Sequence, residues 1–217
     1  MDNIEFYPKG WEFRPRTRWR KKLLHGVGTN DMDYAPAVGK LKCPAYTTWN
    51  SMLERCYSKV YQGRFPTYTG CRTVKSWHIF STFRSWYFEQ RRLIGDYPGR
   101  LELDKDILSD SKTYSPRTAI LIPQSFNSFL TDSAASRSRL PIGVARSGSK
   151  NYYARIGNGR LADGTMTQRN SQVVGTVEEA VKLRTKMKFE RLDKIIPPWV
   201  DYDKVRRRCR KIIRNQK

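Results

Sequence analysis

The chain lacks the patterns that mark several large classes of protein. No apolar run approaches the length of a membrane span, and the first residues do not form a secretion signal. There is no internal repeat, no Walker loop and no dinucleotide-binding fingerprint. We therefore expect a cytoplasmic protein that is neither secreted nor embedded in a membrane.

Histidine and cysteine, the side chains that most often bind zinc, are also few. The chain has two histidines and four cysteines, and no two cysteines form a Cys-x-x-Cys pair. This wide spacing predicts reduced structural thiols. A zinc site would have to be assembled from Cys43, Cys56, Cys71 and His78, and their spacing does not favour one.

Acidic residues number 20 against 42 lysines and arginines, which leaves a formal net charge of +22. A surplus this large is typical of nucleic-acid-binding proteins, because a polyanion offsets the repulsion between the cations. We identify no amphipathic helix that combines a bulky apolar face with a basic face. An anionic membrane is therefore the less favoured partner.

Interruptions by Gly, Pro and small polar residues predict an α+β protein with five segments. They are a basic arm (1–25), a first module (26–130), a linker (131–140), a second module (141–195) and a basic tail or helix (196–217).

Apolar spacing predicts two helices in the first module. Trp49, Met52, Leu53 and Cys56 recur at helical intervals and predict a helix over 46–57, with Thr47 or Thr48 as its N-cap. A second helix is predicted over 77–92, where aromatic residues alternate with basic ones. Aromatics beside arginines could stack on bases, but at helical spacing we interpret them as core.

The segment 101–130 carries an unusual concentration of acids for so basic a chain. Glu102, Asp104 and Asp106 alternate, which predicts three carboxylates on one face of a single strand. A polar turn, an apolar strand at 119–122 and a short helix that includes Asn127 follow. Carboxylate and amide oxygens suit Mg²⁺ or Mn²⁺, so we predict a divalent cation held by Asp104, Asp106 and Asn127 beside a phosphodiester.

The second module has the pattern of a small sheet followed by a helix. Strands are predicted at 142–144 and 152–156, with a third at 172–174, and the glycine-rich stretch 157–164 predicts a hairpin turn. Thr176 and Glu179 form a capping box that opens a helix over 178–192. Seven basic residues and one acidic residue lie between positions 137 and 169.

The first module resembles a group of phage-encoded, HNH-related endonucleases over residues 49–130. The resemblance rests on WNSMLERCY, FPTYTGC, LDKDIL, YSP and IPQSFN, and the family's His, Asn and Asn positions fall on Asp106, Thr118 and Asn127. It implies a ββα-metal finger flanked by helices and a location in phage-infected bacteria. Catalysis would fall to Asp104, Asp106 and Asn127, with Asp106 as base or third ligand and Lys105 as a phosphate contact. The family's imidazole base is absent at this position.

The second module resembles the three-stranded-sheet-plus-helix domain of plant ethylene-response factors, which phage homing endonucleases also carry. The matching residues are IGV at 142–144, YAR at 153–155, GT at 175–176 and EEA at 178–180. In that family the sheet enters the major groove of DNA. The nucleic-acid-binding residues expected in and around this module and in the basic tail are Arg137, Arg139, Arg146, Lys150, Arg155, Arg160, Arg169, Arg206, Arg207 and Arg208.

These patterns together predict an Mg²⁺-dependent or Mn²⁺-dependent endonuclease that cuts duplex DNA. Three alternatives stay open at this point. One is a catalytically inactive protein that binds DNA or RNA on the same scaffold. The others are a basic inhibitor or assembly protein with an acidic protein partner, and an RNA-binding component of a ribonucleoprotein.

Overall fold

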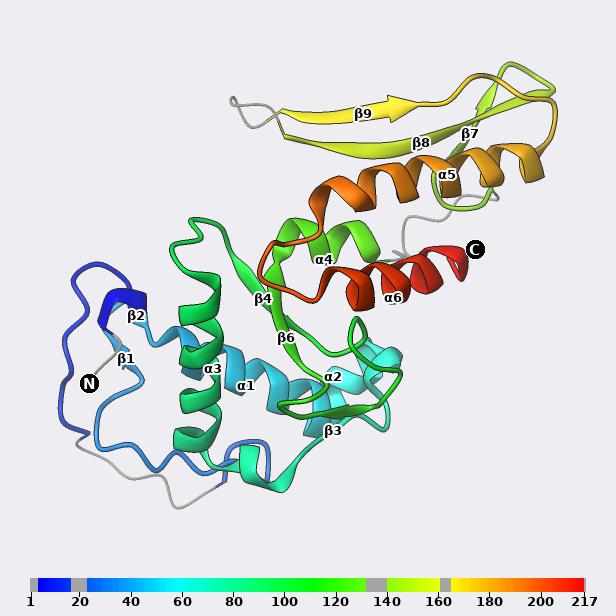
Figure 1. The fold of residues 1–217 in the computed structure, drawn as a ribbon. Coiled ribbons are helices and arrows are strands. Elements are labelled where there is room, and N and C mark those ends of the chain that lie inside the picture. The colour runs from blue at the N-terminus through cyan, green and yellow to red at the C-terminus, as the bar shows by residue number, and fades with distance from the viewer. Residues whose placement is uncertain (1–3, 17–22, 132–139, 161–164, 217) are drawn as a thin grey trace. The chain divides into compact units, whose positions relative to one another are not determined.

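The computed structural model describes residues 4–16, 23–131, 140–160 and 165–216. These residues form a mixed α+β fold with six α-helices and several small sheets (Figure 1). The chain divides into two compact units, Met1–Leu121 and Ile122–Lys217. No helix among the described residues is long and apolar enough to cross a membrane.

Two helices form the centre of unit 1, α1 (Pro44–Tyr57) and α3 (Phe80–Ile94). Trp49 of α1 is fully buried and donates its indole N–H to the carbonyl of Trp77 at 2.7 Å, which ties α1 to the start of α3. Both predicted helices are present, but the second begins at Phe80 and not at Trp77, which lies in the preceding 3-10 helix. Trp77, Phe80, Phe83 and Phe88 are buried, so the interpretation of these aromatics as core is also confirmed.

The start of α1 differs from the prediction. Its N-cap is Cys43, whose Sγ accepts a hydrogen bond from the backbone N–H of Tyr46 at 3.5 Å. Thr47 and Thr48 lie inside the helix and donate their hydroxyls to carbonyls one turn back. Pro44 explains the earlier start, because proline is favoured in the first turn, where its missing N–H costs no hydrogen bond.

Short elements surround this helix pair. Strands β3 (Arg72–Thr73) and β5 (Thr113–Tyr114) pair in parallel, and β4 (Leu101–Asp104) pairs with β6 (Ile120–Pro123). The remaining elements of unit 1 are η1 (Ile4–Phe6), β1 (Ala37–Val38), β2 (Leu41–Lys42), α2 (Lys59–Arg64), η2 (Pro66–Tyr68) and η3 (Lys75–His78).

The described part of the N-terminal segment contributes to the core of unit 1. Tyr7 and Trp11 are buried, and the Tyr7 ring stacks on Phe88 of α3 with centroids 5.4 Å apart. The predicted arm therefore carries an aromatic anchor ahead of its basic stretch. Residues 17–22, the most basic part of the arm, lie outside the described residues.

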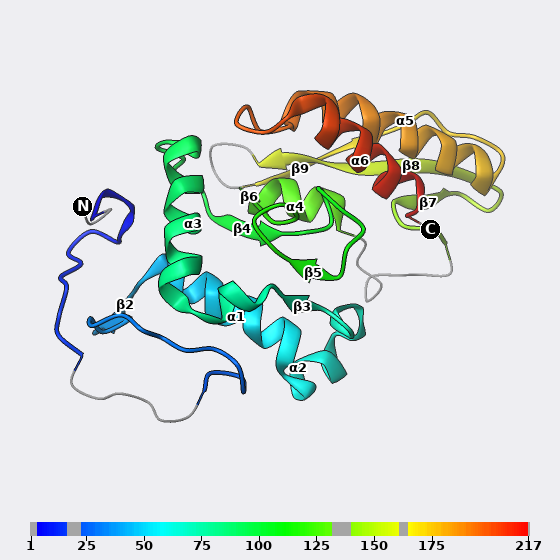
Figure 2. The same ribbon diagram turned by 60° about the horizontal axis from the view of Figure 1, so that its bottom comes forward.

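Unit 2 is built around a three-stranded antiparallel sheet of β7 (Val144–Ser147), β8 (Asn151–Arg160) and β9 (Met166–Asn170). Helix α5 (Val177–Ile195) packs along one face of this sheet (Figures 1 and 2). Ala154 and Ile156 of β8 are buried against Met187 of α5. Both hydrogen bonds of the capping box predicted at Thr176 and Glu179 are present.

The third strand and the hairpin turn are not where the sequence predicted them. Gly157 and Gly159 lie inside β8, where the pairing with β9 shifts register. Gly159 has φ +101°, and such a bulge lets a strand continue through a sequence that is typical of a turn. The third strand is β9, while Val174 makes only an isolated bridge to Tyr152.

The C-terminal segment, predicted as a basic tail or helix, forms helix α6 (Tyr202–Arg214). This helix also corrects the expectation that the chain has no helix with an apolar face and a basic face. It is amphipathic: Val205, Cys209 and Ile213 are buried, and seven lysines and arginines occupy other positions. Its amphipathic character is hard to read from the sequence, because only three of its residues form the buried face and cations adjoin each of them.

A buried polar network joins α5, α6 and the short helix α4 (Gln124–Leu130). The ammonium of Lys188 donates to the carbonyl of Phe129 and to Oε1 of Gln216, each at 2.7 Å. Gln216 in turn donates its amide to the carbonyl of Leu130 at 2.7 Å. The last carbonyls of α4 thus accept hydrogen bonds from a side chain of α5 and from Gln216, which follows the end of α6.

Replacement of Gly143 should destabilise the sheet of unit 2. Its φ is +68°, and an added Cβ would lie 2.6 Å from the carbonyl oxygen of Arg155. We expect Gly143→Ala to weaken the protection of sheet amides from hydrogen exchange by about 2 kcal/mol. The control is Gly157→Ala, where a Cβ meets nothing within 4 Å. Equal protection in the two variants would contradict the assigned geometry.

Candidate functional site

The acidic segment of unit 1 forms a strand end followed by a turn. Strand β4 ends at Asp104, whose Oδ1 accepts a hydrogen bond from the backbone N–H of Ile107 at 2.8 Å. This bond turns the chain, and the buried side chain of Ile107 anchors the turn. Asp106 therefore lies in the turn. The prediction that it shares one strand face with Glu102 and Asp104 is wrong.

A buried cation lies beside the exposed carboxylate of this turn. The Lys105 ammonium is 2.5 Å from Oδ1 of Asp106 and 5.8 Å from the centre of the Tyr114 ring. The Lys105 residue is only 4% exposed. Since the ammonium already binds Asp106, the phosphate contact expected of Lys105 stays a prediction.

The carboxyl group of Asp104 has an altered acidity. Its pKa is raised to about 6, mainly by burial and also by the nearby negative charge of Asp106, while the hydrogen bond from Ile107 partly opposes the shift. A carboxyl with a pKa near 6 can exchange a proton close to neutral pH. An aspartate with an ordinary pKa near 4 does not do so.

Arg55 of α1 holds the acidic strand in place. Its guanidinium donates to the carbonyl of Leu103 at 3.3 Å and lies 5.6 Å from the centre of the Tyr68 ring. It is a positioning residue, because it fixes the backbone one residue before Asp104. Arg55 was not among the residues predicted from the sequence, because its only signal there is a position beside the apolar stripe of α1.

The divalent cation expected at the acidic turn stays a prediction. Among the described residues, no three or more His, Cys, Asp or Glu side chains are arranged to hold a metal ion. Mg²⁺, however, is commonly held by one or two carboxylates while water and substrate phosphates complete its shell. Asp104 and Asp106 provide such a pair, and a dication beside them would stabilise the charge that burial disfavours on Asp104.

The third predicted ligand, Asn127, lies on α4 in unit 2. It is half-buried, and its carbonyl accepts a hydrogen bond from the Thr131 hydroxyl at 3.0 Å. Its role as a metal ligand stays a prediction.

The four cysteines are buried and form no disulfide, and burial raises the pKa of the Cys56 thiol to about 12.

A second candidate site is the face of the unit 2 sheet opposite α5. Because side chains alternate along a strand, Tyr153 and Arg155 of β8 point away from the buried Ala154 and Ile156. Asn170 of β9 lies directly opposite Arg155. Gln168 lies opposite Gly157, and we call the set Tyr153, Arg155, Gln168 and Asn170 the open face.

The predicted cations of this module are divided between the two faces and the turns. Arg155 is exposed on the open face. Arg169 is on the other face, where it pairs with Glu190 of α5 at 2.9 Å. Arg146 is exposed with its guanidinium 5.8 Å from the centre of the Tyr152 ring, and Lys150 is exposed in the β7–β8 turn.

The side chains of three further predicted arginines are not described by the structure. Arg137 and Arg139 are outside the described residues, and only the backbone of Arg160 is described. On α6, Arg206 pairs with Asp193 at 2.6 Å, while Arg207 is exposed and Arg208 is half-buried.

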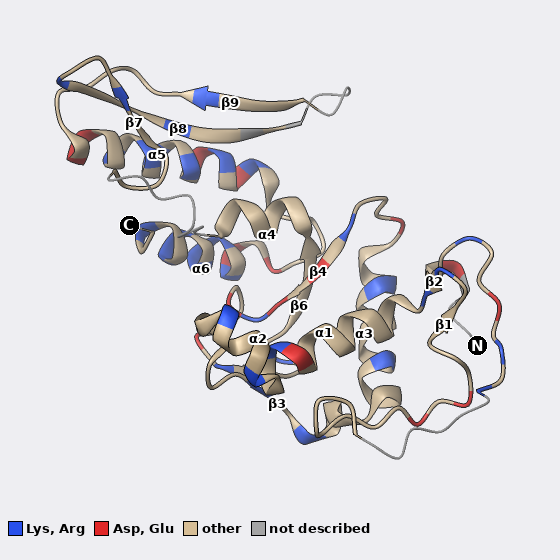
Figure 3. Ribbon diagram, turned by 180° about the vertical axis from the view of Figure 1, so that it is seen from behind, with Lys and Arg blue, Asp and Glu red and all other residues tan. Residues whose placement is uncertain are grey.

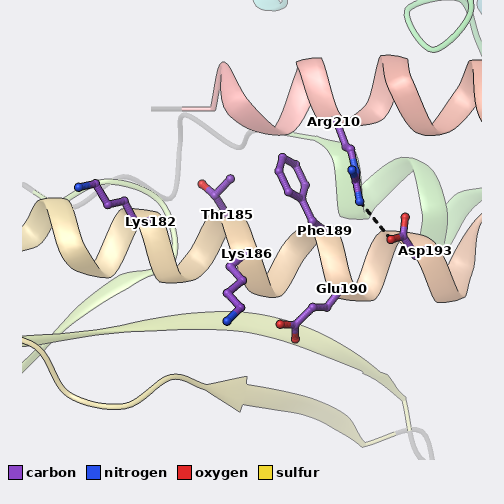
Figure 4. Close-up of a pocket in the computed structure, with 7 residues that line it drawn as sticks. All are labelled: Lys182, Thr185, Lys186, Phe189, Glu190, Asp193 and Arg210. Atoms are coloured by element: carbon purple, nitrogen blue, oxygen red, sulfur yellow. Dashed lines mark hydrogen bonds and ion pairs between the residues drawn. The ribbon is translucent and has the colours of Figure 1, made fainter.

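A shallow groove of about 390 Å³ lies between α5 and α6 (Figure 4). Its wall includes Phe189, whose ring centre is 4.9 Å from the guanidinium of Arg210. Arg210 also pairs with Asp193 at 3.2 Å. The charged groups at this end of the groove therefore hold the two helices together.

Comparison with known proteins assigns neither unit to a family. The chain matches no protein-family model, no curated protein and no solved structure.

The raised pKa of Asp104 predicts a pH-dependent gain in stability for Asp104→Asn. Between pH 4 and pH 6 the folded protein retains a proton that the unfolded chain has lost, so the free energy of unfolding falls as the pH rises. Above pH 6 this penalty is complete. Without added metal, we expect Asp104→Asn to be more stable than the unmodified protein by about 1–3 kcal/mol at pH 7.5, with no gain at pH 4.

Thermal or urea unfolding followed by tryptophan fluorescence measures this difference, because five of the six tryptophans lie in residues 1–121. The control is Asp96→Asn at an exposed position of the same unit, which should change stability by less than about 0.5 kcal/mol. A gain for Asp104→Asn that is equal at both pH values would show that the carboxyl is not perturbed.

Proposed function

We propose that the protein binds duplex DNA through the open face of the unit 2 sheet. The observation that carries this proposal is the side-chain content of that face. Arg155, Gln168 and Asn170 stand together on neighbouring strands, and these are the residue types that form paired hydrogen bonds with guanine and adenine edges in the major groove.

The surroundings of the open face support this function. Gly157 and Ala145 are small, which lets another molecule approach the backbone of the sheet closely. The side chain of Arg155 makes no hydrogen bond or ion pair with the residues that the structure describes. The resemblance to the three-stranded-sheet-plus-helix domain of ethylene-response factors also implies that the sheet enters the major groove.

RNA is the weaker candidate for this face. The major groove of an RNA duplex is deep and narrow, so side chains on a sheet do not reach its base edges. Duplex DNA has a major groove wide enough for strands. Competition between duplex DNA and structured RNA separates the two partners directly.

Replacement of one arginine tests the open face. We expect Arg155→Gln to weaken the binding of a selected duplex by about 10- to 100-fold and to relax its sequence preference. The control is Arg169→Gln, which removes the same charge from the opposite face of the same sheet. Fluorescence anisotropy with labelled duplexes measures both variants. Equal losses would indicate a charge effect without base recognition.

We propose further that the acidic turn of unit 1 carries the metal-dependent cleavage of the bound DNA. Over residues 101–130 the elements run β4, β5, β6 and α4. Strands β4 and β6 pair with each other and α4 follows, which is the order expected of a ββα finger, while β5 lies in the connection and pairs with β3. Asp104 and Asp106 would hold Mg²⁺ or Mn²⁺, which supplies polarisation of the scissile phosphate and stabilisation of the leaving oxygen.

The chain's own residues would act around this centre. Asp106, which is exposed, offers a carboxylate to solvent and substrate, and Arg55 fixes the strand that carries Asp104. Lys105 keeps the Asp106 carboxylate oriented through its short ion pair. The resemblance assigns the family's helix asparagine to Asn127, and its part in metal binding stays a prediction.

Cleavage of supercoiled plasmid tests the acidic turn. With Mg²⁺ or Mn²⁺ we expect nicked or linear DNA, no product in EDTA, and a loss of at least about 100-fold in rate for Asp106→Asn. The control is Asp110→Asn, an equal change of charge four residues away, which should retain activity. If the unmodified protein binds duplexes but leaves plasmid intact with either metal, the cleavage proposal is contradicted and the inactive DNA-binding alternative holds.

A further inference from the structure

One strongly charged surface of unit 2 is separate from the sheet. Helix α6 carries seven lysines and arginines within thirteen residues, and Figure 3 shows these cations along its length. The cations of α6 differ in their burial and in the groups that they contact. Three sets of positions have different surroundings, and the seventh cation, the half-buried Arg208, belongs to none of them.

The first set is apolar and used for folding. Val205, Cys209 and Ile213 recur at i, i+4 and i+8, and each is at most 1% exposed. The second set is basic and also used for folding. Arg206 binds Asp193 of α5 with two hydrogen bonds of 2.6 and 3.0 Å, and Arg210 binds the same carboxylate at 3.2 Å.

Asp193 is thereby committed to these two arginines, which hold its pKa below the usual range of a carboxyl. The pair of contacts fixes the rotation of α6 about its own axis relative to α5. This rotation decides which cations remain on the outside of unit 2.

The third set is basic and exposed, and consists of Lys204, Arg207, Lys211 and Arg214, of which Arg214 also lies 5.5 Å from the centre of the Phe189 ring of α5. At 3.6 residues per turn these positions fall within about 80° of arc and span about 15 Å along the axis. We call them the α6 stripe. Like charges at this spacing destabilise a helix, so the stripe has a cost that a bound polyanion would remove.

We propose that the α6 stripe binds the phosphate backbone of duplex DNA independently of base sequence. The proposal rests on the DNA binding proposed above and adds a second contact surface to it. About nine phosphates lie along 15 Å of duplex, which is enough to engage every cation of the stripe. Phosphate contacts of this kind position a protein on DNA, while base contacts such as those of the open face select the sequence.

The buried face of α6 argues for nucleic acid over a membrane. A helix that binds an anionic membrane inserts its apolar face among the lipid chains. The apolar face of α6 is already packed inside unit 2. Only the charged side of the helix is left for a partner, and charged side chains are sufficient to bind a phosphate backbone.

The salt dependence of DNA binding tests the stripe. The probe is a labelled duplex of random sequence, titrated with the full-length protein between 50 and 200 mM NaCl. We expect Lys204→Gln/Arg207→Gln to reduce the slope of log affinity against log salt by about 2. Between 50 and 200 mM NaCl, the fold-loss of affinity of the double variant should therefore be about ten times smaller than that of the unmodified protein.

The matched control removes two exposed lysines from the neighbouring helix, Lys182→Gln/Lys186→Gln. It should change the slope by less than about 0.5, because the proposal places no phosphate against these lysines. An equal slope change in both double variants, or none in either, overturns the proposal. Binding to anionic vesicles that the stripe variant abolishes, with DNA binding unchanged, also overturns it.

Failure of the stripe and failure of the proposed function give different results. If the unmodified protein binds no duplex at any salt concentration, the proposed function fails and the stripe fails with it. If Arg155→Gln weakens selected binding while the stripe variant keeps the full slope, only the stripe is wrong. Thermal unfolding of both double variants verifies that α6 remains folded.

Discussion

Helix α5 is the constraint on which the second unit depends, because it packs on two sides at once. On one side Met187 buries β8 through Ala154 and Ile156. On another, Lys188 and Asp193 bind α4, Gln216 and the arginines of α6. A single helix thus uses one face of the sheet and leaves the other open. The same helix turns the apolar side of α6 inward and the α6 stripe outward.

The two proposed DNA surfaces therefore have one physical origin but different chemistry. The open face combines one arginine with two side-chain amides, a set suited to the hydrogen-bonding pattern of bases. The α6 stripe has only cations, a set suited to phosphates. The candidate site of unit 1 has the opposite charge, because Asp104 and Asp106 place two carboxyl groups in a basic protein. A dication beside a phosphodiester would reconcile those carboxylates with a polyanionic substrate.

Helices and the core were predictable because their signals are local. The apolar spacing of Trp49, Met52 and Leu53 and the capping box at Thr176 identified two helices. The acidic strand was located, but Asp106 was misplaced, since alternation along a chain does not reveal where a strand ends. The hydrogen bond from Ile107 to Asp104 ends it. Gly157 and Gly159 were misread for a similar reason: pairing with β9, a non-local contact, decides between a bulge and a turn. The roles of Arg206 and Arg207 also depend on a partner distant in sequence, Asp193.

The central claim is that unit 2 meets DNA with the open face of its sheet and with one side of α6. Titration of the full-length, isotope-labelled protein with a short duplex, followed by amide NMR shifts, tests this claim most directly. We predict the largest shifts around Arg155, Gln168 and Asn170 and along the exposed positions of α6, with small shifts at the buried side of α5. Shifts confined to unit 1, or none at low salt, would contradict the account.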